Sequence, residues 1–139
     1  MNPEVRAAPL FAWPVRVYYE DTDAGGVVYY ANYLKFFERA RTEWLRSFGL
    51  NQDKLAREEG LIFVVRRALL DFVRPARLDD LLEITVEPLK LAHVYVDLAQ
   101  EARCGAQVVA RVQIRVACLA QRSFKPVPLP QSLRESITT

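Results

Sequence analysis

One stretch of helical periodicity, followed by a long region of two-residue alternation, constrains the fold of this chain most strongly. Between residues 33 and 48 the apolar side chains recur at the spacing of an amphipathic helix, in a stripe wide enough to pack against a sheet. From residue 61 to residue 118 apolar and polar side chains alternate in four runs, separated by short turns, which predict four long strands. Gly49 is placed to end the helix.

A fifth strand is predicted before the helix. Val15, Val17 and Tyr19 alternate with polar or amphipathic residues from Arg16 to Glu20, the period of a half-buried strand. The order is therefore strand, long helix, then four strands. A single helix cannot cover both faces of a five-stranded sheet, so we expect a meander wrapped around the helix. This is an α+β hotdog fold, and its long apolar edges predict pairing with at least one further copy of the chain.

The chain length predicts one domain, spanning residues 1–139. Residues 1–12 are expected to form a loose arm, because prolines discourage regular structure there. The segment from Asn51 to Gly60 is expected to hold one or two helical turns, capped by Asn51 and ending at Gly60. Residues 123–139 contain three more prolines and are expected to run along the surface as a tail.

Composition excludes several classes of function. The formal net charge of +2 and the lack of a basic block argue against nucleic-acid binding. Cys104 and Cys118 are the only cysteines, too few for a disulfide framework, so a reducing compartment is expected. The first ten residues lack the apolar core of a signal peptide, and no apolar run approaches the ~20 residues of a membrane span. We therefore expect a cytoplasmic protein.

An acidic, glycine-containing loop joins the first strand to the helix. Asp21 and Asp23 follow the strand, and Gly25 and Gly26 permit backbone angles closed to other residues and let a ligand approach the main chain. From this local pattern alone the two aspartates are best explained by an Asx turn. By propensity, Asn32 is the expected N-cap of the helix.

This region closely resembles the Tol-Pal-associated acyl-CoA thioesterases of the YbgC type, within the wider 4-hydroxybenzoyl-CoA thioesterase family. The match touches most of the chain, and a string of this length is highly specific. The matching segments are residues 17–29, Ala31, 33–34, 37–43, 63–66, 75–80 and 125–126.

The resemblance implies hydrolysis of an acyl-CoA thioester without a metal or organic cofactor. It also implies a homodimer or homotetramer, with the acyl pocket between subunits. Asp23 matches the catalytic carboxylate of the motif, acting as a nucleophile or as a general base on water. The backbone amide of Tyr30 matches the oxyanion donor, at a helix start where amides lack partners and the dipole favours negative charge. The expected cap at Asn32 conflicts with this assignment, because it exposes later amides.

Further residues are expected to contact the substrate. Coenzyme A carries phosphates and needs cations at the mouth of the pocket. A basic segment near Lys90 binds the nucleotide in some relatives, although each candidate cation alone would ordinarily be a solvated surface charge. The expected substrate-binding residues are Gly25, Gly26, Val27, Tyr29, Tyr33, Arg66 and Lys90, with Arg67 as a further cation.

Two residues complicate the resemblance. The YbgC-type proteins commonly carry His where this chain has Tyr30, whereas other members of the wider family carry Tyr. Glu38 is the alternative catalytic carboxylate, because some hotdog thioesterases use a glutamate on the helix. Its simpler explanation is an ion pair with Arg39 or Arg41, or across a dimer.

Two other functions remain open. A hotdog hydratase or dehydratase would usually pair a histidine with a carboxylate near the helix, and His93, the only histidine, lies far along the chain. A non-catalytic module that binds an acyl-carrier protein or an envelope complex is the second alternative. The intact motif around Asp23 argues against pure binding.

Overall fold

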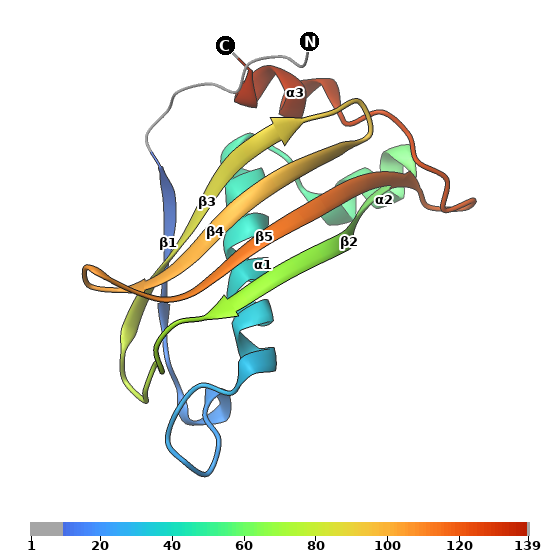
Figure 1. Ribbon diagram of the computed structural model, residues 1–139. Coiled ribbons are helices and arrows are strands. Elements are labelled where there is room, and N and C mark those ends of the chain that lie inside the picture. The colour runs from blue at the N-terminus through green and yellow to red at the C-terminus, as the bar shows by residue number, and fades with distance from the viewer. Residues whose placement is uncertain (1–9, 139) are drawn as a thin grey trace.

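The structure is a computed structural model that describes residues 10–138, which form a five-stranded antiparallel sheet curved around one long helix (Figure 1). The strands lie in the order β1-β3-β4-β5-β2. This arrangement confirms the predicted hotdog fold. The elements are β1 (Phe11–Arg16), the 3-10 helix η1 (Tyr19–Asp21), α1 (Tyr30–Ser47), α2 (Gln52–Glu59), β2 (Leu61–Phe72), β3 (Leu81–Leu91), β4 (Tyr95–Cys104), β5 (Gln107–Ala120) and α3 (Gln131–Ile137).

Helix α1 buries its predicted apolar stripe against the concave face of the sheet. Phe36, Phe37 and Ala40 are completely buried, and Leu82 and Ile84 of β3 belong to the same core. Burial of one such large side chain contributes about 1.5–3 kcal/mol relative to leaving it in water. The helix is therefore fixed along its length, and its first turn has a defined position relative to the sheet.

The short helix α2 has the predicted caps. The Asn51 side chain accepts a hydrogen bond of 3.0 Å from the amide of Lys54, and Gly60 ends the helix with a left-handed φ of 66°. Both positions favour the residue present, since Asn satisfies a free amide and Gly adopts positive φ without steric cost. The chain then enters β2 directly.

The first strand differs from its prediction at both ends. Strand β1 begins at Phe11, inside the predicted arm of residues 1–12, most of which lies outside the described residues. Pro14 is tolerated in the strand because β1 is an edge of the sheet and need not donate on its outer side. The strand ends at Arg16 rather than near Glu20, because the chain turns into η1 instead.

The C-terminal tail contributes to the core, contrary to the prediction of a surface segment. Leu129, Leu133 and Ile137 are each buried, the last two on α3, which lies across the end of the β3–β4 hairpin (Figure 1). Arg134 fixes the helix there by donating a hydrogen bond of 3.0 Å to the carbonyl of Ala92. The short amphipathic pattern of α3 was not predicted as a helix, because the prolines that precede it indicated an irregular tail.

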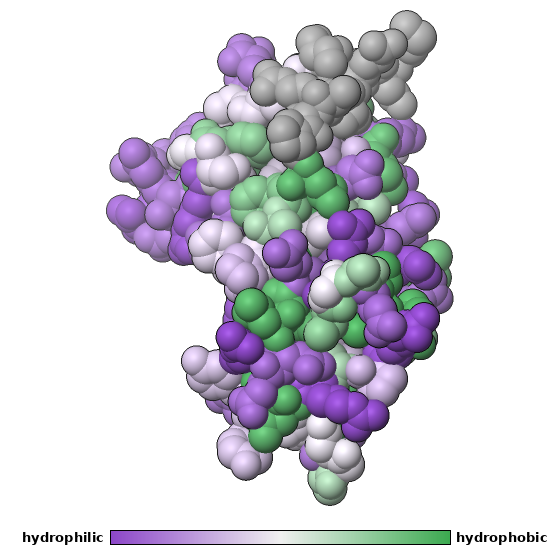
Figure 2. Space-filling model, turned by 90° about the vertical axis from the view of Figure 1, so that its left-hand side faces the viewer, coloured by the Kyte–Doolittle hydropathy of each residue, from purple (hydrophilic) through white to green (hydrophobic). Residues whose placement is uncertain are grey.

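The two edges of the sheet differ in character. Beside β1, apolar and polar surfaces alternate (Figure 2), and Pro14 interrupts the row of donors. On β2 and just beyond it, exposed apolar side chains recur along the strand, namely Val65, Leu69, Phe72 and Val73. Within residues 10–138, no helix has the length and apolar character required to cross a membrane.

Candidate active site

The loop between η1 and α1 is a short hairpin that begins at Asp23. The amide of Asp23 donates to the carbonyl of Val27 at 2.9 Å, and the amide of Gly26 donates to the carbonyl of Asp23 at 3.0 Å. Gly26 has a φ of 77°, a conformation in which a side chain would be strained. The predicted use of this glycine for an unusual backbone conformation is therefore confirmed.

The Asp23 side chain is exposed at the start of this hairpin. Its Oδ1 accepts a hydrogen bond of 2.8 Å from the amide of Gly25, which is the Asx turn expected from the local pattern. A β-carbon at position 25 would lie 3.2 Å from Oδ1, so glycine suits this close approach. In the described part of the chain Oδ2 accepts no hydrogen bond. One carboxylate oxygen is thus held in place while the other is available to solvent or to a ligand.

Asp21 has a different role, although it lies only two residues away. Its side chain is buried, with 4% exposed, and accepts hydrogen bonds from the Tyr18 amide at 2.8 Å and from the Asn32 side-chain nitrogen at 2.7 Å. The first bond closes η1, and the second joins it to the first turn of α1. A buried carboxylate requires such donors, because an unpaired charge is costly away from water. Asp21 therefore anchors the loop.

The start of α1 corrects the expected cap at Asn32. The helix begins at Tyr30, and Tyr29 occupies the N-cap position in an extended conformation without a side-chain cap bond. Asn32 is the third helical residue, and its amide side chain serves Asp21 instead. Asn favours the N-cap position, but the side chain of Asn32 instead hydrogen-bonds with Asp21 from inside the helix.

The first two backbone amides of α1 form no hydrogen bond in the described part of the chain. The Asn32 amide donates to the Tyr29 carbonyl at 2.9 Å, but the Tyr30 and Ala31 amides have no acceptor among residues 10–138. Free amides at the N-terminus of an 18-residue helix, aligned with its dipole, stabilise a negatively charged oxygen. The predicted donor, Tyr30, is thus the first residue of the helix.

The segment after β2 closes the other side of the loop. The Val28 amide donates to the Ala76 carbonyl at 2.8 Å, Val27 forms a bridge with Arg77, and the Ala76 amide donates to the Tyr33 hydroxyl at 3.2 Å. Burial raises the pKa of the Tyr33 phenol, so it stays protonated through the physiological range. The loop, the start of α1 and the segment between β2 and β3 are therefore joined around Ala76.

An open groove of about 300 Å³ lies where these parts meet. Tyr30 is exposed and its ring packs edge-on against that of Phe72, with centroids 6.2 Å apart. The groove thus starts at the residue that begins α1. Its walls are formed by Val28, Tyr30, Tyr33, Phe72, Val73, Arg74 and Pro75.

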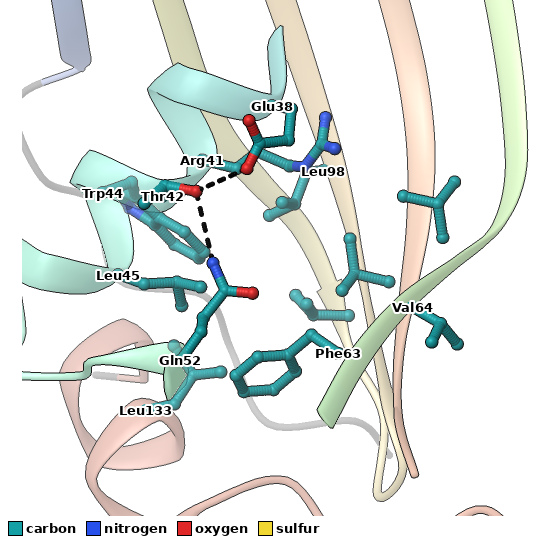
Figure 3. Close-up of a pocket in the computed structure, with 13 residues that line it drawn as sticks. Glu38, Arg41, Thr42, Trp44, Leu45, Gln52, Phe63, Val64, Leu98 and Leu133 are labelled. Atoms are coloured by element: carbon teal, nitrogen blue, oxygen red, sulfur yellow. Dashed lines mark hydrogen bonds between the residues drawn. The ribbon is translucent and has the colours of Figure 1, made fainter. Parts of the chain in front are cut away.

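Glu38, the alternative carboxylate, lines a separate cavity of about 210 Å³ (Figure 3). Its Oε1 accepts a hydrogen bond of 2.8 Å from the Thr42 hydroxyl, which in turn accepts one of 3.2 Å from Gln52. Among residues 10–138 Glu38 forms no ion pair with Arg39 or Arg41, and Arg41 donates to Gln100 at 3.0 Å instead. Burial lowers the pKa of the Arg41 guanidinium, partly offset by the Glu38 charge.

The cavity at Glu38 is distant from the start of α1. Glu38 follows Tyr30 by two helical turns, which corresponds to about 12 Å along the axis. Glu38 is therefore not beside the free amides of its own chain.

The predicted cations do not lie at the groove of this chain. Arg66 is the extra residue of a bulge in the middle of β2, and Arg67 follows it. Lys90 lies near the far end of β3, roughly 30 Å from Leu81, beside which the loop is anchored. Its ammonium lies instead 5.5 Å from the Tyr95 ring centroid. No role was predicted for Arg74 or Arg77, although Arg77 lies within the matching segment 75–80 and Arg74 directly precedes it.

Comparison with known proteins places this geometry in a family. The profile of the "Thioesterase-like superfamily" matches residues 17–137. The chain belongs to this superfamily. It is 43% identical to the "Acyl-CoA thioesterase YbgC" of Haemophilus influenzae, over 89% of this chain and 91% of that protein. It is 44% identical to the "Acyl-CoA thioester hydrolase YbgC" of Escherichia coli O6:H1, over 89% of this chain and 92% of that protein.

A solved structure extends the comparison to the fold. A 1,4-dihydroxy-2-naphthoyl-CoA thioesterase from Synechocystis superposes with a TM-score of 0.85 at 28% identity, covering 91% of this chain and 94% of that one. The predicted resemblance to the YbgC-type proteins is therefore confirmed, and the fold is shared with an enzyme named for an aromatic acyl-CoA.

The two loop aspartates should differ in their effect on stability. Asp21→Asn places an amide NH₂ against one of two donors, so we expect the free energy of unfolding to fall by about 1–3 kcal/mol. Asp23→Asn keeps the oxygen that accepts from Gly25, and its exposed position predicts a change within about 0.5 kcal/mol. Urea unfolding of both variants measures the difference, and equal losses would contradict the anchoring role of Asp21.

Proposed function

We propose that this chain is an acyl-CoA thioesterase whose site is built from the Asp23 loop and the first turn of α1. The observation that supports it best is the juxtaposition of a carboxylate with an available oxygen and a helix that begins at Tyr30 with free amides. The named activities of the YbgC relatives agree with this chemistry. Thioester hydrolysis needs a base or nucleophile and a donor for the carbonyl oxygen.

In the proposed reaction the thioester carbonyl oxygen accepts a hydrogen bond from the Tyr30 amide. Asp23 either takes a proton from water as the water oxygen attacks the carbonyl carbon, or attacks that carbon itself to form an anhydride that water then hydrolyses. In both routes the carbon–sulfur bond breaks, and coenzyme A leaves as a thiol after gaining a proton. The bond from Gly25 orients the carboxylate without occupying its second oxygen.

The substrate is proposed to lie against the loop and the groove. Gly25, Gly26 and Val27 present backbone, and Tyr29 and Tyr33 stand at the start of α1. The relatives suggest acyl-CoA as the substrate class, and the chemistry proposed here requires no cofactor.

A second copy is proposed to complete the site. The outer edge of β2 pairs with no strand among residues 10–138 and carries exposed apolar side chains, including Leu69 at 63% exposure. Such an edge favours pairing with an identical strand. Phe72 contacts Tyr30 at the end of this edge, so a dimer interface there would border the groove. Arg66 and Lys90 could then reach coenzyme A only from the second copy.

The alternatives receive less support. His93 is exposed in the turn between β3 and β4, at the opposite end of the sheet from the loop, which disfavours a hydratase. An acyl-carrier protein as partner, association with a Tol-Pal or other envelope complex, and a cytoplasmic location stay predictions.

Replacement of Asp23 tests the proposed reaction. Asp23→Asn keeps the shape and the turn but removes the charge and the basic oxygen, so we expect turnover to be abolished in a folded protein. Asp21→Asn should retain more activity despite its lower stability. Thiol release from a panel of acyl-CoAs measures both. Substantial activity in Asp23→Asn would exclude this residue and favour Glu38.

Replacement of Tyr30 tests the oxyanion donor. Tyr30→Pro removes the amide hydrogen at the first helical position, where proline is tolerated, and Tyr29 already has the extended conformation that precedes proline (φ −77°, ψ 149°). We expect kcat to fall about a hundredfold or more, the usual effect of losing one oxyanion donor. Tyr30→Phe and Tyr30→His should stay active. Near-normal kcat in a folded Tyr30→Pro protein would disprove the assignment.

The oligomeric state can be measured directly. Light scattering should give two or four times the 16.0 kDa chain mass at micromolar concentration. Leu69→Lys should shift the protein toward monomer and lower activity, because it puts a charge on the β2 edge. Leu89→Lys, at a leucine on β3 with 46% exposure, is the matched control and should change neither. An active wild-type monomer would refute the intersubunit site.

A further inference from the structure

The groove beside Tyr30 leads to two arginines that the proposed reaction does not use. Arg74 forms part of the groove wall, and Arg77 lies next to Val27 of the loop. We propose that Arg74 and Arg77 bind the phosphates of coenzyme A, and that its pantetheine arm occupies the groove between them and the Tyr30 amide. This inference rests on the proposed function and replaces Arg66 and Lys90 as the principal phosphate ligands.

The position of both arginines is fixed by the backbone around them. The Arg74 amide donates to the Val109 carbonyl at 3.1 Å, and the Arg77 amide donates to the Asp80 side chain at 2.9 Å. Ala76, between them, is completely buried and is tied to α1 through the Tyr33 hydroxyl. The two side chains therefore emerge from a rigid segment that is attached to the catalytic loop.

Both guanidinium groups are available for an anion. They are exposed, and neither has a carboxylate oxygen within 4 Å in the described part of the chain. Arg103, Arg111 and Arg115 of β4 and β5 differ, since each of them is paired with an acidic residue. A planar guanidinium binds phosphate oxygens through two parallel hydrogen bonds, which suits a diphosphate.

The groove itself has the character required for a pantetheine arm. Phe72 and Val73 supply apolar wall, and the groove is also lined by Tyr30, whose backbone amide has no acceptor among residues 10–138. Pantetheine is narrow, partly apolar and carries the thioester at one end and the diphosphate at the other. In the proposed complex the thioester lies at Tyr30 and the diphosphate at Arg74 and Arg77.

Two substrates with the same acyl group test the proposal. Acyl-CoA carries the phosphates, whereas the acyl thioester of N-acetylcysteamine lacks them. In Arg74→Ala/Arg77→Ala we expect KM for acyl-CoA to rise at least tenfold, the scale of one lost charge-assisted hydrogen bond, while kcat and KM for the short substrate are unchanged. The lysine double variant should recover part of the loss. Arg122→Ala, an exposed arginine in the turn after β5 at the far end of β2, is the charge-matched control and should match wild type.

Calorimetric titration with free coenzyme A separates this inference from the proposed function. Wild type should bind coenzyme A at least tenfold more tightly than the double alanine variant, whether or not it hydrolyses a thioester. Absence of hydrolysis with this difference intact would refute the thioesterase and leave the phosphate site standing. Equal affinity in wild type and variant, or equal losses on both substrates, would overturn the phosphate site.

Discussion

The arrangement of the site depends on one buried carboxylate. Asp21 accepts from the Tyr18 amide where β1 has ended and from the Asn32 side chain in the first turn of α1. These two bonds join the sheet edge to the helix across the loop, and the Asp21 side chain is buried there. Because both carboxylate oxygens of Asp21 accept a hydrogen bond, the contact fixes the orientation of the loop relative to α1 as well as the distance between them. The hairpin that begins at Asp23 therefore starts from a rigid base.

A rigid base allows the reactive groups to be exposed. Asp23 lies in the hairpin next to the anchor, and the bridge from Val27 to Arg77 holds the opposite side. The free amides of α1 cannot shift, because Phe36 and Phe37 bury the following turns. Carboxylate and donors are thus positioned by parts of the chain that share one core. The same core fixes the post-β2 segment that carries Arg74.

Patterns local in sequence predicted much of this structure, and contacts between distant residues account for what they missed. The spacing of Phe36, Phe37 and Ala40 predicted α1, and alternation predicted β2 to β5 within a few residues. Propensity predicts a cap at Asn32, because propensity does not identify its hydrogen-bond partner Asp21. The predicted first strand began several residues too late. Pro14 argues against a strand unless the strand lies at the edge of the sheet, and only the strand pairing shows that β1 is an edge. Lys90 was predicted to contact the substrate, and β3 places it at the far end of the sheet from the loop of the same chain.

The central claim is that the thioester carbonyl binds at the start of α1 beside Asp23. A crystal structure with an acyl-CoA analogue in which methylene replaces the thioester sulfur tests it most directly. We expect the carbonyl oxygen about 2.7–3.1 Å from the Tyr30 nitrogen, with the Asp23 carboxylate facing the carbonyl carbon directly or through one water. A carbonyl bound instead in the cavity at Glu38, away from the Tyr30 amide, would contradict the account.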